Sequence, residues 1–172
     1  IGKWHLDGHG RSSYIPRERR LGFEDYWKVL ECTHDYWNSR YYENDSEDIK
    51  EWDGYDTFAQ TEDAVNYLKT RKTDNPFFLM LSYGTPHNPY QTAPDKYKKL
   101  YDKEKLKLPP NIAEGCQKKA REGLQGYYAH ITAMDEGIGK IVDILEEQGM
   151  AENTILVVTS DHGDCVWSHC DS

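Results

Sequence analysis

Two short apolar runs, each followed by a polar segment, indicate where strands lie in this chain. The run Phe77–Leu81 leads into a loop with two prolines, and the run Ile155–Val158 leads into the polar segment Thr159–Asp164. Uninterrupted apolar runs of this length, bounded by turn residues, are typical of strands that are buried on both faces. The sequence therefore predicts buried strands at Phe77–Leu81 and Thr154–Ser160, with polar side chains at their carboxyl ends.

Two longer stretches have the apolar spacing of amphipathic helices. The first runs from Thr57 to about Arg71, and its segment Thr57–Gln60 has the form of a capping box. The second runs from Ala120 to Gln148 and is followed by Gly149, where a left-handed helix cap is expected. Each predicted helix precedes a predicted strand, which is the order of an α/β fold. The apolar stripe of the second helix is expected to face the core: Leu124, Tyr127, Ile131, Met134, Ile138, Val142 and Leu145.

Residues 11–56 show neither a helical nor a strand period. The sequence predicts a long irregular excursion here, with one short element at Glu24–Leu30. Loops of this length in a compact domain are usually functional or disordered, and the aromatic content favours an ordered loop. The rings can stack on a sugar or aryl ligand, although packing beneath the loop is expected for most of them: Tyr26, Trp27, Tyr36, Trp37, Tyr41, Tyr42 and Trp52.

Composition and charge restrict the classes of partner. The chain has 172 residues, of which 37% are hydrophobic and 13% aromatic, and this indicates a folded domain. Residues 1–22 carry five basic and two acidic side chains, a net charge of +3, within a chain whose net charge is -9. A basic opening segment can bind a small anion, while the overall charge disfavours nucleic acid. No run of about 18 apolar residues occurs, so no membrane span is expected.

Three groups of polar residues are candidates for chemistry. Lys3 and His5 lie among glycines, where the backbone and cationic side chains can approach an oxyanion closely. His87 follows the first predicted strand and is flanked by prolines, as an ordinary loop histidine can also be. Asp161 and His162 follow the second predicted strand and are either a pair of metal ligands or a polar turn. The four cysteines lack zinc-type spacing, so they are assigned no function.

Three motifs stand in order along the chain: Gly-Lys-Trp-His at residues 2–5, Thr-Pro-His-Asn-Pro at 85–89 and Thr-Ser-Asp-His-Gly-Asp at 159–164. Together with the long helix that precedes the third motif, they resemble the sulfatase family of the alkaline phosphatase superfamily. The resemblance implies a three-layer α/β/α sandwich with a mixed, mostly parallel sheet, of which this chain supplies a part. It also implies that residues 1–172 belong to a single sulfatase catalytic domain.

The resemblance implies a role for each candidate residue. In this family a cysteine or serine is oxidised to formylglycine, whose hydrate attacks the sulfur of a sulfate ester beside a divalent metal. Lys3 matches the lysine that holds sulfate oxygens, and His5 matches the histidine that hydrogen-bonds the formylglycine hydroxyl. His87 matches the histidine at the leaving-group oxygen of the bound substrate, where an acidic partner eases departure. Asp161, with His162 beside it, matches a carboxylate that binds the metal, which acts as a Lewis acid.

This sequence departs from the sulfatase pattern in three places. Many sulfatases carry Asn where His162 stands and bind calcium, so the imidazole also allows manganese here. The glycines expected on either side of Ser168-His169 are replaced, and the second active-site lysine expected beyond them is absent. No Cys-x-Pro-x-Arg motif for formylglycine occurs, and the metal aspartates expected with it are missing. This chain alone is therefore expected to be inactive, with Asp161 and His162 offering only two metal ligands.

The resemblance implies a parent enzyme that hydrolyses a carbohydrate sulfate or a small-molecule aryl sulfate. Two alternatives stay open. One is a phosphonate or phosphodiester hydrolase of the same superfamily, which Asp-His at 161–162 permits, and the other is a non-catalytic, truncated sulfatase-like domain. A partial sheet exposes strand edges, so this chain can also form a homo-oligomer. By family resemblance alone, a periplasmic, extracellular or lysosomal location is favoured over a cytoplasmic one.

Overall fold

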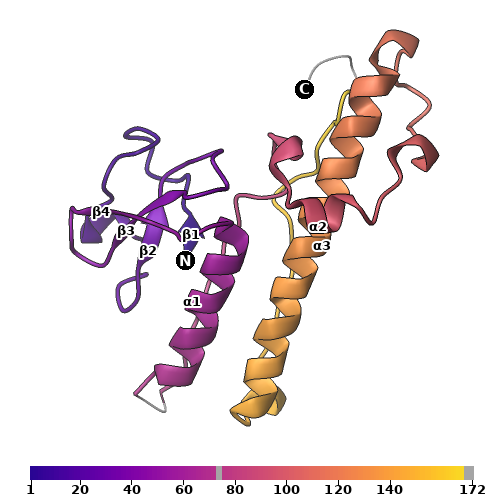
Figure 1. The fold of residues 1–172 in the computed structure, drawn as a ribbon. Helices are drawn as coiled ribbons and strands as arrows, with labels where there is room; N and C mark the ends of the chain where they lie inside the picture. Colours follow the sequence, from indigo (N-terminus) through magenta and orange to yellow (C-terminus); the bar gives the residue numbers. More distant parts are fainter. Residues whose placement is uncertain (73–74, 169–172) are drawn as a thin grey trace.

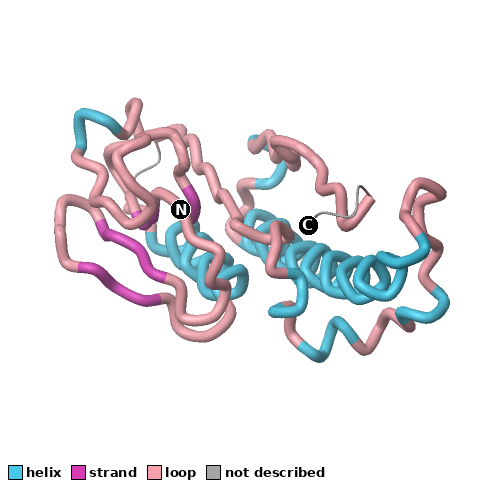
Figure 2. The backbone as a smooth tube through the Cα atoms, turned by 90° about the horizontal axis from the view of Figure 1, so that it is seen from above, coloured by secondary structure: helices cyan, strands magenta, loops and turns pink. Residues whose placement is uncertain are grey.

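The computed structural model describes residues 1–72 and 75–168 of the chain. Helix α1 (Asp56–Thr70) lies between the strands and the long helix α3 (Gln117–Glu147) in two perpendicular views (Figure 1, Figure 2). Helices and a mixed sheet in one chain confirm the predicted α/β class. Within the described ranges, none of the helices combines the length and the apolar character needed to cross a membrane.

Four short strands form one mixed sheet in the order β1-β2-β3-β4. β1 (Gly2–Lys3) runs parallel to β2 (Lys28–Leu30). β2 is antiparallel to β3 (Arg40–Glu43), which is antiparallel to β4 (Ile49–Glu51). β2 lies within the short element predicted at Glu24–Leu30, whereas the prediction of an irregular excursion was wrong where β3 and β4 form. Strands of three or four residues are too short to show an alternating pattern, and so the sequence did not identify them as strands.

Both predicted long helices are present, and the end of α3 is capped as expected. Gly149 has a φ of 65°, and its amide donates a hydrogen bond to the carbonyl oxygen of Glu146 at 2.9 Å. The predicted capping box of α1, in contrast, was wrong. Thr57 lies inside the helix, and its hydroxyl oxygen is 2.9 Å from the hydroxyl oxygen of Thr85. This threonine therefore holds a neighbouring loop instead of the helix end.

Small residues form much of the buried face of α3, and of the predicted stripe of large apolar side chains Leu124 and Leu145 are buried. Gly126, Ala133 and Gly137 are buried, whereas Ile131 of the predicted stripe is 40% exposed. A Cβ atom on Gly126 would lie only 2.1 Å from the carbonyl oxygen of Tyr90. Hydrophobic periodicity did not locate this face because close approach of the backbone requires the absence of large side chains.

Neither predicted buried strand is buried on both faces. The run Ile155–Val158 is exposed, with Ile155 at 92%. In the run Phe77–Leu81, Phe77, Leu79 and Leu81 pack against the apolar cluster around Leu68, whereas Phe78 is 80% exposed. Both predictions were therefore wrong, because neither run pairs as a named strand in the described part of the chain. An extended backbone becomes a strand only where a neighbouring backbone supplies hydrogen-bond partners.

Two apolar clusters hold α1 in place. The first joins Trp52, which follows β4, to Leu68 of α1 and Ile144 of α3. The second joins Tyr36 to Ala133 of α3, and Phe58 of α1 packs against it. The remaining short elements are the helix α2 and several 3-10 turns: Asp95–Lys98 (α2), Arg17–Arg19, Tyr90–Thr92, Lys103–Lys105, Glu114–Cys116 and Ala151–Asn153.

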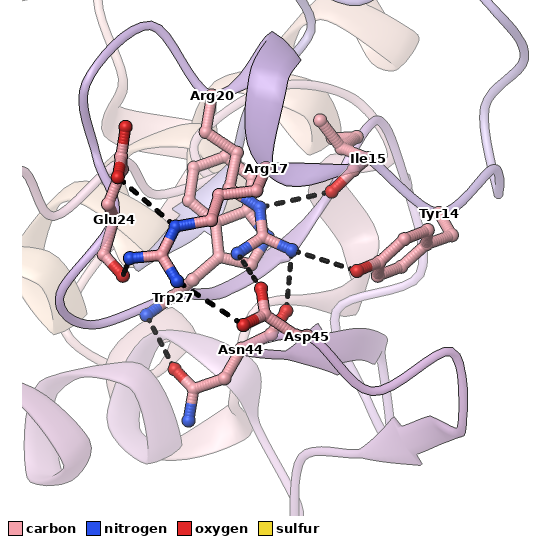
Figure 3. Close-up of polar contacts among 8 residues, drawn as sticks. All are labelled: Tyr14, Ile15, Arg17, Arg20, Glu24, Trp27, Asn44 and Asp45. Carbon is pink, nitrogen blue, oxygen red and sulfur yellow. Dashed lines mark hydrogen bonds and ion pairs between the residues drawn. The ribbon is translucent and has the colours of Figure 1, made fainter.

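A buried arginine connects the segments on both sides of β2 (Figure 3). The side chain of Arg20 is fully buried; its Nε donates to the carbonyl oxygen of Ile15 at 3.0 Å, and its Nη2 donates to that of Asn44 at 2.6 Å. The guanidinium also lies 4.9 Å from the ring centre of Trp27 and 3.0 Å from Oδ1 of Asp45. This cluster therefore orders the part of the chain that carries β2.

Candidate anion-binding site at one edge of the sheet

Three backbone segments that run in the same direction end at one edge of the sheet. Gly2 of β1 pairs in parallel with Val29 of β2 on one side and with Ser82 on the other. The amide of Lys3 donates to the carbonyl oxygen of Ser82 at 2.8 Å, which fixes this third segment beside β1. In open α/β sheets, ligand sites lie beyond the carboxyl ends of such parallel segments.

The three segment ends deliver basic side chains to one place. Lys3 and His5 come from the end of β1, His34 follows β2, and His87 follows the third segment. The ring of His34 stacks on the ring of His87, with centres 4.3 Å apart and planes inclined by 24°. Burial lowers the pKa of His34, and four positive groups lower it further: His87, Lys3, Arg11 and His5. The structure thus groups the predicted residues Lys3, His5 and His87 with two residues that the sequence did not indicate.

Three basic side chains of this group have no carboxylate partner in the described part of the chain. Within residues 1–72 and 75–168, the side chains of Lys3, His5 and Arg11 form no hydrogen bond or ion pair. The buried carboxylate of Glu31 is engaged elsewhere, because it accepts the amides of residues 7 and 8 at 3.1 and 3.0 Å. It therefore orders the glycine loop and leaves the positive charges available. Uncompensated positive charge at a sheet edge favours binding of an anion.

Tyr36 and helix α1 fix the loop that carries His87. The side chain of Tyr36 is fully buried, and its hydroxyl lies 2.9 Å from the carbonyl oxygen of His87 and 3.2 Å from that of Gly84. On the other side, Thr57 of α1 contacts the hydroxyl of Thr85 in the same loop. The backbone position of His87 is therefore determined by packed elements and does not depend on the loop alone.

The ring of His87 has one nitrogen engaged and one available. Its Nδ1 lies 2.9 Å from the carbonyl oxygen of Asn88. A carbonyl oxygen can only accept, so Nδ1 carries a proton and donates it. Nε2 makes no hydrogen bond to any described residue. It is therefore the nitrogen of His87 that can exchange a proton with a ligand.

The predicted metal ligands Asp161 and His162 lie in an exposed turn. The carboxylate of Asp161 accepts the amide of His162 at 2.9 Å, and the two side chains are 87% and 67% exposed. Among the residues that the structure describes, no three His, Cys, Asp or Glu side chains are grouped as a metal site needs. These two donors therefore do not fit a complete divalent-metal site by themselves.

The segment that follows these two residues approaches the loop of His87. Burial raises the pKa of Tyr90, and the nearby carboxylate of Asp164 raises it further. Val166 belongs to the same apolar cluster as Tyr90. The structure thus places Asp164, the last residue of the third motif, near Tyr90, which directly follows the second motif. His169 and Cys170, which the resemblance also involved, lie outside the described residues.

Sequence reasoning missed His34, Arg11 and Tyr36. His34 follows β2, whose apolar part is only Val29-Leu30, so no strand was expected before it. The available signal was the order of an apolar pair followed by a polar turn and a histidine, which is a shorter version of the pattern that marked His87. Arg11 and Tyr36 carry no local signal, since only the fold brings them to this edge.

These features define an α/β protein with a cationic, ligand-accessible edge, and comparison with known proteins gives its family. The family model described as Sulfatase matches residues 1–169. An Ulvan-active sulfatase from Formosa agariphila is 53% identical over 164 residues, which cover 95% of this chain and 32% of that protein. An endo-4-O-sulfatase from Bacteroides thetaiotaomicron is 30% identical, and the match covers 91% of this chain and 32% of that protein.

A solved structure gives the same result for the fold. The crystal structure of a Bacteroides fragilis protein assigned as the sulfatase yidJ superposes with a TM-score of 0.87 at 31% identity. The match covers 98% of this chain and 41% of that structure. The chain belongs to the sulfatase family, as its three motifs indicated. It spans about a third of the length of the curated relatives named above.

Proposed function

We propose that the protein to which this chain belongs hydrolyses sulfate esters of a carbohydrate. The observation that carries the proposal is a group of basic side chains at one sheet edge, Lys3, His5 and Arg11, that have no carboxylate partner among the described residues and lie beside the stacked ring of His87. Such a group suits a sulfate monoanion, whose charge is spread over its oxygens. The name of the Formosa agariphila relative, which states activity on ulvan, supports a carbohydrate as the alcohol part of the ester.

In this proposal the chain's own residues have separate roles in sulfate-ester hydrolysis. Lys3 binds sulfate oxygens, and His5 and Arg11 add positive charge on the same side of the sheet edge. His87 is placed to donate a proton from Nε2 to the oxygen that leaves with the sugar. A sugar alkoxide is a poor leaving group, and a positioned acid of this kind contributes about 10²–10⁴-fold.

A formylglycine and a divalent metal are part of the proposal for the whole protein. The formylglycine would supply the nucleophile of the reaction, and the metal, when bound, would supply the Lewis acid. Asp161 and His162 are proposed as two of the metal ligands, for calcium or, because of the imidazole, manganese. The 172 residues contain no Cys-x-Pro-x-Arg motif. This chain by itself is therefore proposed to be inactive, and self-association of the isolated chain stays a prediction.

Sulfate release from ulvan by the full-length protein tests the proposal. Lys3→Ala is expected to lower kcat/KM by about 10²-fold or more, since a group that stabilises developing charge is lost. The matched control is Lys105→Ala, because Lys105 is an exposed lysine whose one ion pair among the described residues is with Asp102 at 3.2 Å. No sulfate release by the wild-type protein, or equal losses in the two variants, would contradict the proposal. Turnover of an aryl sulfate by the 172-residue chain alone would contradict its expected inactivity.

The imidazole of His162 favours one alternative activity. A carboxylate next to an imidazole suits a transition metal, as in the phosphonate and phosphodiester hydrolases that the sequence resemblance left open. Rates on 4-nitrophenyl sulfate and bis(4-nitrophenyl) phosphate distinguish the two activities in the full-length protein. A higher kcat/KM on the phosphodiester would replace the sulfatase proposal with this alternative. A protein inactive on both esters and on ulvan would indicate the non-catalytic domain instead.

A further inference from the structure

We propose that His34 and Tyr36 are positioning residues that hold the ring and the backbone of His87 for proton transfer. The inference rests on the proposed function, in which His87 serves the leaving-group oxygen. It assigns a task to two residues of the segment after β2. No motif in the sequence marked either of them.

Two contacts from one segment fix the same histidine in complementary ways. The hydroxyl of Tyr36 lies within hydrogen-bond distance of three carbonyl oxygens: those of His87 at 2.9 Å, Gly84 at 3.2 Å and Asn88 at 3.3 Å. The ring of His34 lies flat on the ring of His87, with centres 4.3 Å apart. The first contact fixes where the loop lies, and the second restricts rotation of the imidazole about its side-chain bonds.

The stack leaves the reactive edge of His87 accessible. Its Nδ1 is directed at the carbonyl oxygen of Asn88, at 2.9 Å, so Nε2 lies on the opposite edge of the ring. A ring stacked on one face keeps both edges open to ligands. His34 therefore constrains orientation without occupying the nitrogen that transfers the proton.

The charges around His34 are compatible with this task. Burial and the positive charges of Lys3, His5, Arg11 and His87 all lower the pKa of His34. A lowered pKa favours the neutral form of His34, and a neutral ring can stack on the ring of His87 without like-charge repulsion. The only other polar contact of His34 among the described residues is with Sγ of Cys32, 3.9 Å from its Nε2.

The segment that carries both residues is itself well held. The amide of Cys32 donates to the carbonyl oxygen of Arg11 at 2.9 Å. The amide of Asp35 donates to the hydroxyl of Thr33 at 3.0 Å, which closes a turn around His34. Tyr36 is fully buried. A fixed segment of this kind can impose an orientation on His87, whereas a mobile one could not.

The experiment measures sulfate release from ulvan by the full-length protein and by four variants: His34→Ala, His34→Phe, His87→Ala and the double variant His34→Ala/His87→Ala. His34→Ala is expected to lower kcat by about 10-fold and to leave KM within about twofold, because orientation matters at the proton-transfer step. His34→Phe keeps a stacking ring of similar size and is expected to retain kcat within about threefold. It is the variant that keeps the test valid if His34→Ala fails to fold.

The double variant tests whether His34 acts through His87. If it does, adding His34→Ala to His87→Ala causes no further loss, since nothing remains to be oriented. Additive losses overturn the inference. Equal losses in His34→Phe and His34→Ala also overturn it, because they show that the nitrogen atoms of His34 are needed. A raised KM at unchanged kcat overturns it in favour of substrate binding by His34.

Tyr36→Phe tests the backbone contact separately. Removal of the hydroxyl leaves the buried ring in place and is expected to lower kcat by about 3- to 10-fold, with KM little changed. An unchanged kcat overturns the assignment of Tyr36. Failure of the proposed function is a distinct result: a wild-type protein that releases no sulfate from ulvan overturns the function, and the inference about His34 and Tyr36 with it.

Discussion

Replacing Arg20 by methionine is expected to lower the free energy of unfolding by about 2–4 kcal/mol. Methionine keeps much of the aliphatic stem but removes every polar contact of the guanidinium. Arg20 has no exposed surface, and its Nε is the donor to the buried carbonyl oxygen of Ile15. The substitution therefore leaves a buried acceptor without a partner, which costs about 1–3 kcal/mol.

Loss of the cation over an aromatic ring adds to that cost. The guanidinium carbon lies 4.9 Å from the ring centre of Trp27, a contact worth about 1–2 kcal/mol in a buried setting. The ion pair with Asp45 adds little, because the carboxylate is 61% exposed and exposed pairs contribute about 0–1 kcal/mol. Relief of the desolvation of Arg20 offsets part of the total, which gives the range of about 2–4 kcal/mol.

The matched control is Asp45→Asn, which removes the charge partner of Arg20 and leaves its buried contacts intact. It is expected to cost less than about 1 kcal/mol. Urea unfolding followed by tryptophan fluorescence measures both variants, with an unchanged slope required for the comparison. A cost below about 1 kcal/mol for Arg20→Met, or an equal cost for the two variants, would refute the reasoning that buried acceptors and not the ion pair make Arg20 important.

The remaining predictions concern buried ionisable groups and helix packing. Burial raises the pKa of Asp56 to about 7 and lowers that of His130 to about 4, from ordinary values of 3.8 and 6.5. The folded state favours protonated Asp56, so the contribution of Asp56 to the free energy of unfolding is lost as pH rises towards 7. The folded state favours neutral His130, so the contribution of His130 is lost as pH falls towards 4. The free energy of unfolding of each variant is compared with that of wild type between about pH 4.5 and 6. For Asp56→Asn this difference should rise by about 1.4 kcal/mol per pH unit, and for His130→Gln it should fall by the same amount. Parallel plots of unfolding free energy against pH for all three proteins would contradict both pKa shifts. Gly126→Ala should lower the free energy of unfolding by about 2 kcal/mol or more, because the added Cβ would lie 2.1 Å from the carbonyl oxygen of Tyr90. Gly139→Ala is the control: a Cβ there would have no described atom within 4 Å, and the substitution should raise the free energy of unfolding by up to about 1 kcal/mol. Equal melting temperatures of the two variants would refute the packing argument.

The long helices could be predicted from the sequence because their apolar period repeats over several turns. In α3, leucine and isoleucine at steps of three and four signalled the helix, although Ala133 and Gly137 form part of its actual buried face. Small residues carry no hydrophobic signal, yet they determine which side of a helix another backbone can approach. The period therefore located the helix in the sequence, while the packing against Tyr90 determined its orientation.

Residues of the candidate site could be predicted only where glycines or prolines flank the functional side chain. Glycines lie beside Lys3 and His5, and prolines flank His87, so the sequence alone indicates all three as candidates. His34 is marked by neither, and it joins the site because β2 lies parallel to β1. That pairing links residues more than twenty-five positions apart in sequence, with Gly2 opposite Val29, and no local pattern encodes it.

The prediction of buried strands at the two apolar runs failed for a different physical reason. An apolar run records the burial of side chains, whereas a strand also needs backbone partners on its edges. Ser82, immediately after Phe77–Leu81, obtains such a partner from Gly2, and the histidine loop that follows is correspondingly well placed. Ile155–Val158 has none within the described residues, and Asp161 and His162 beyond it lie in an exposed turn. The contrast shows that pairing of the preceding segment, more than the polar motif itself, determines whether candidate side chains are held in a site.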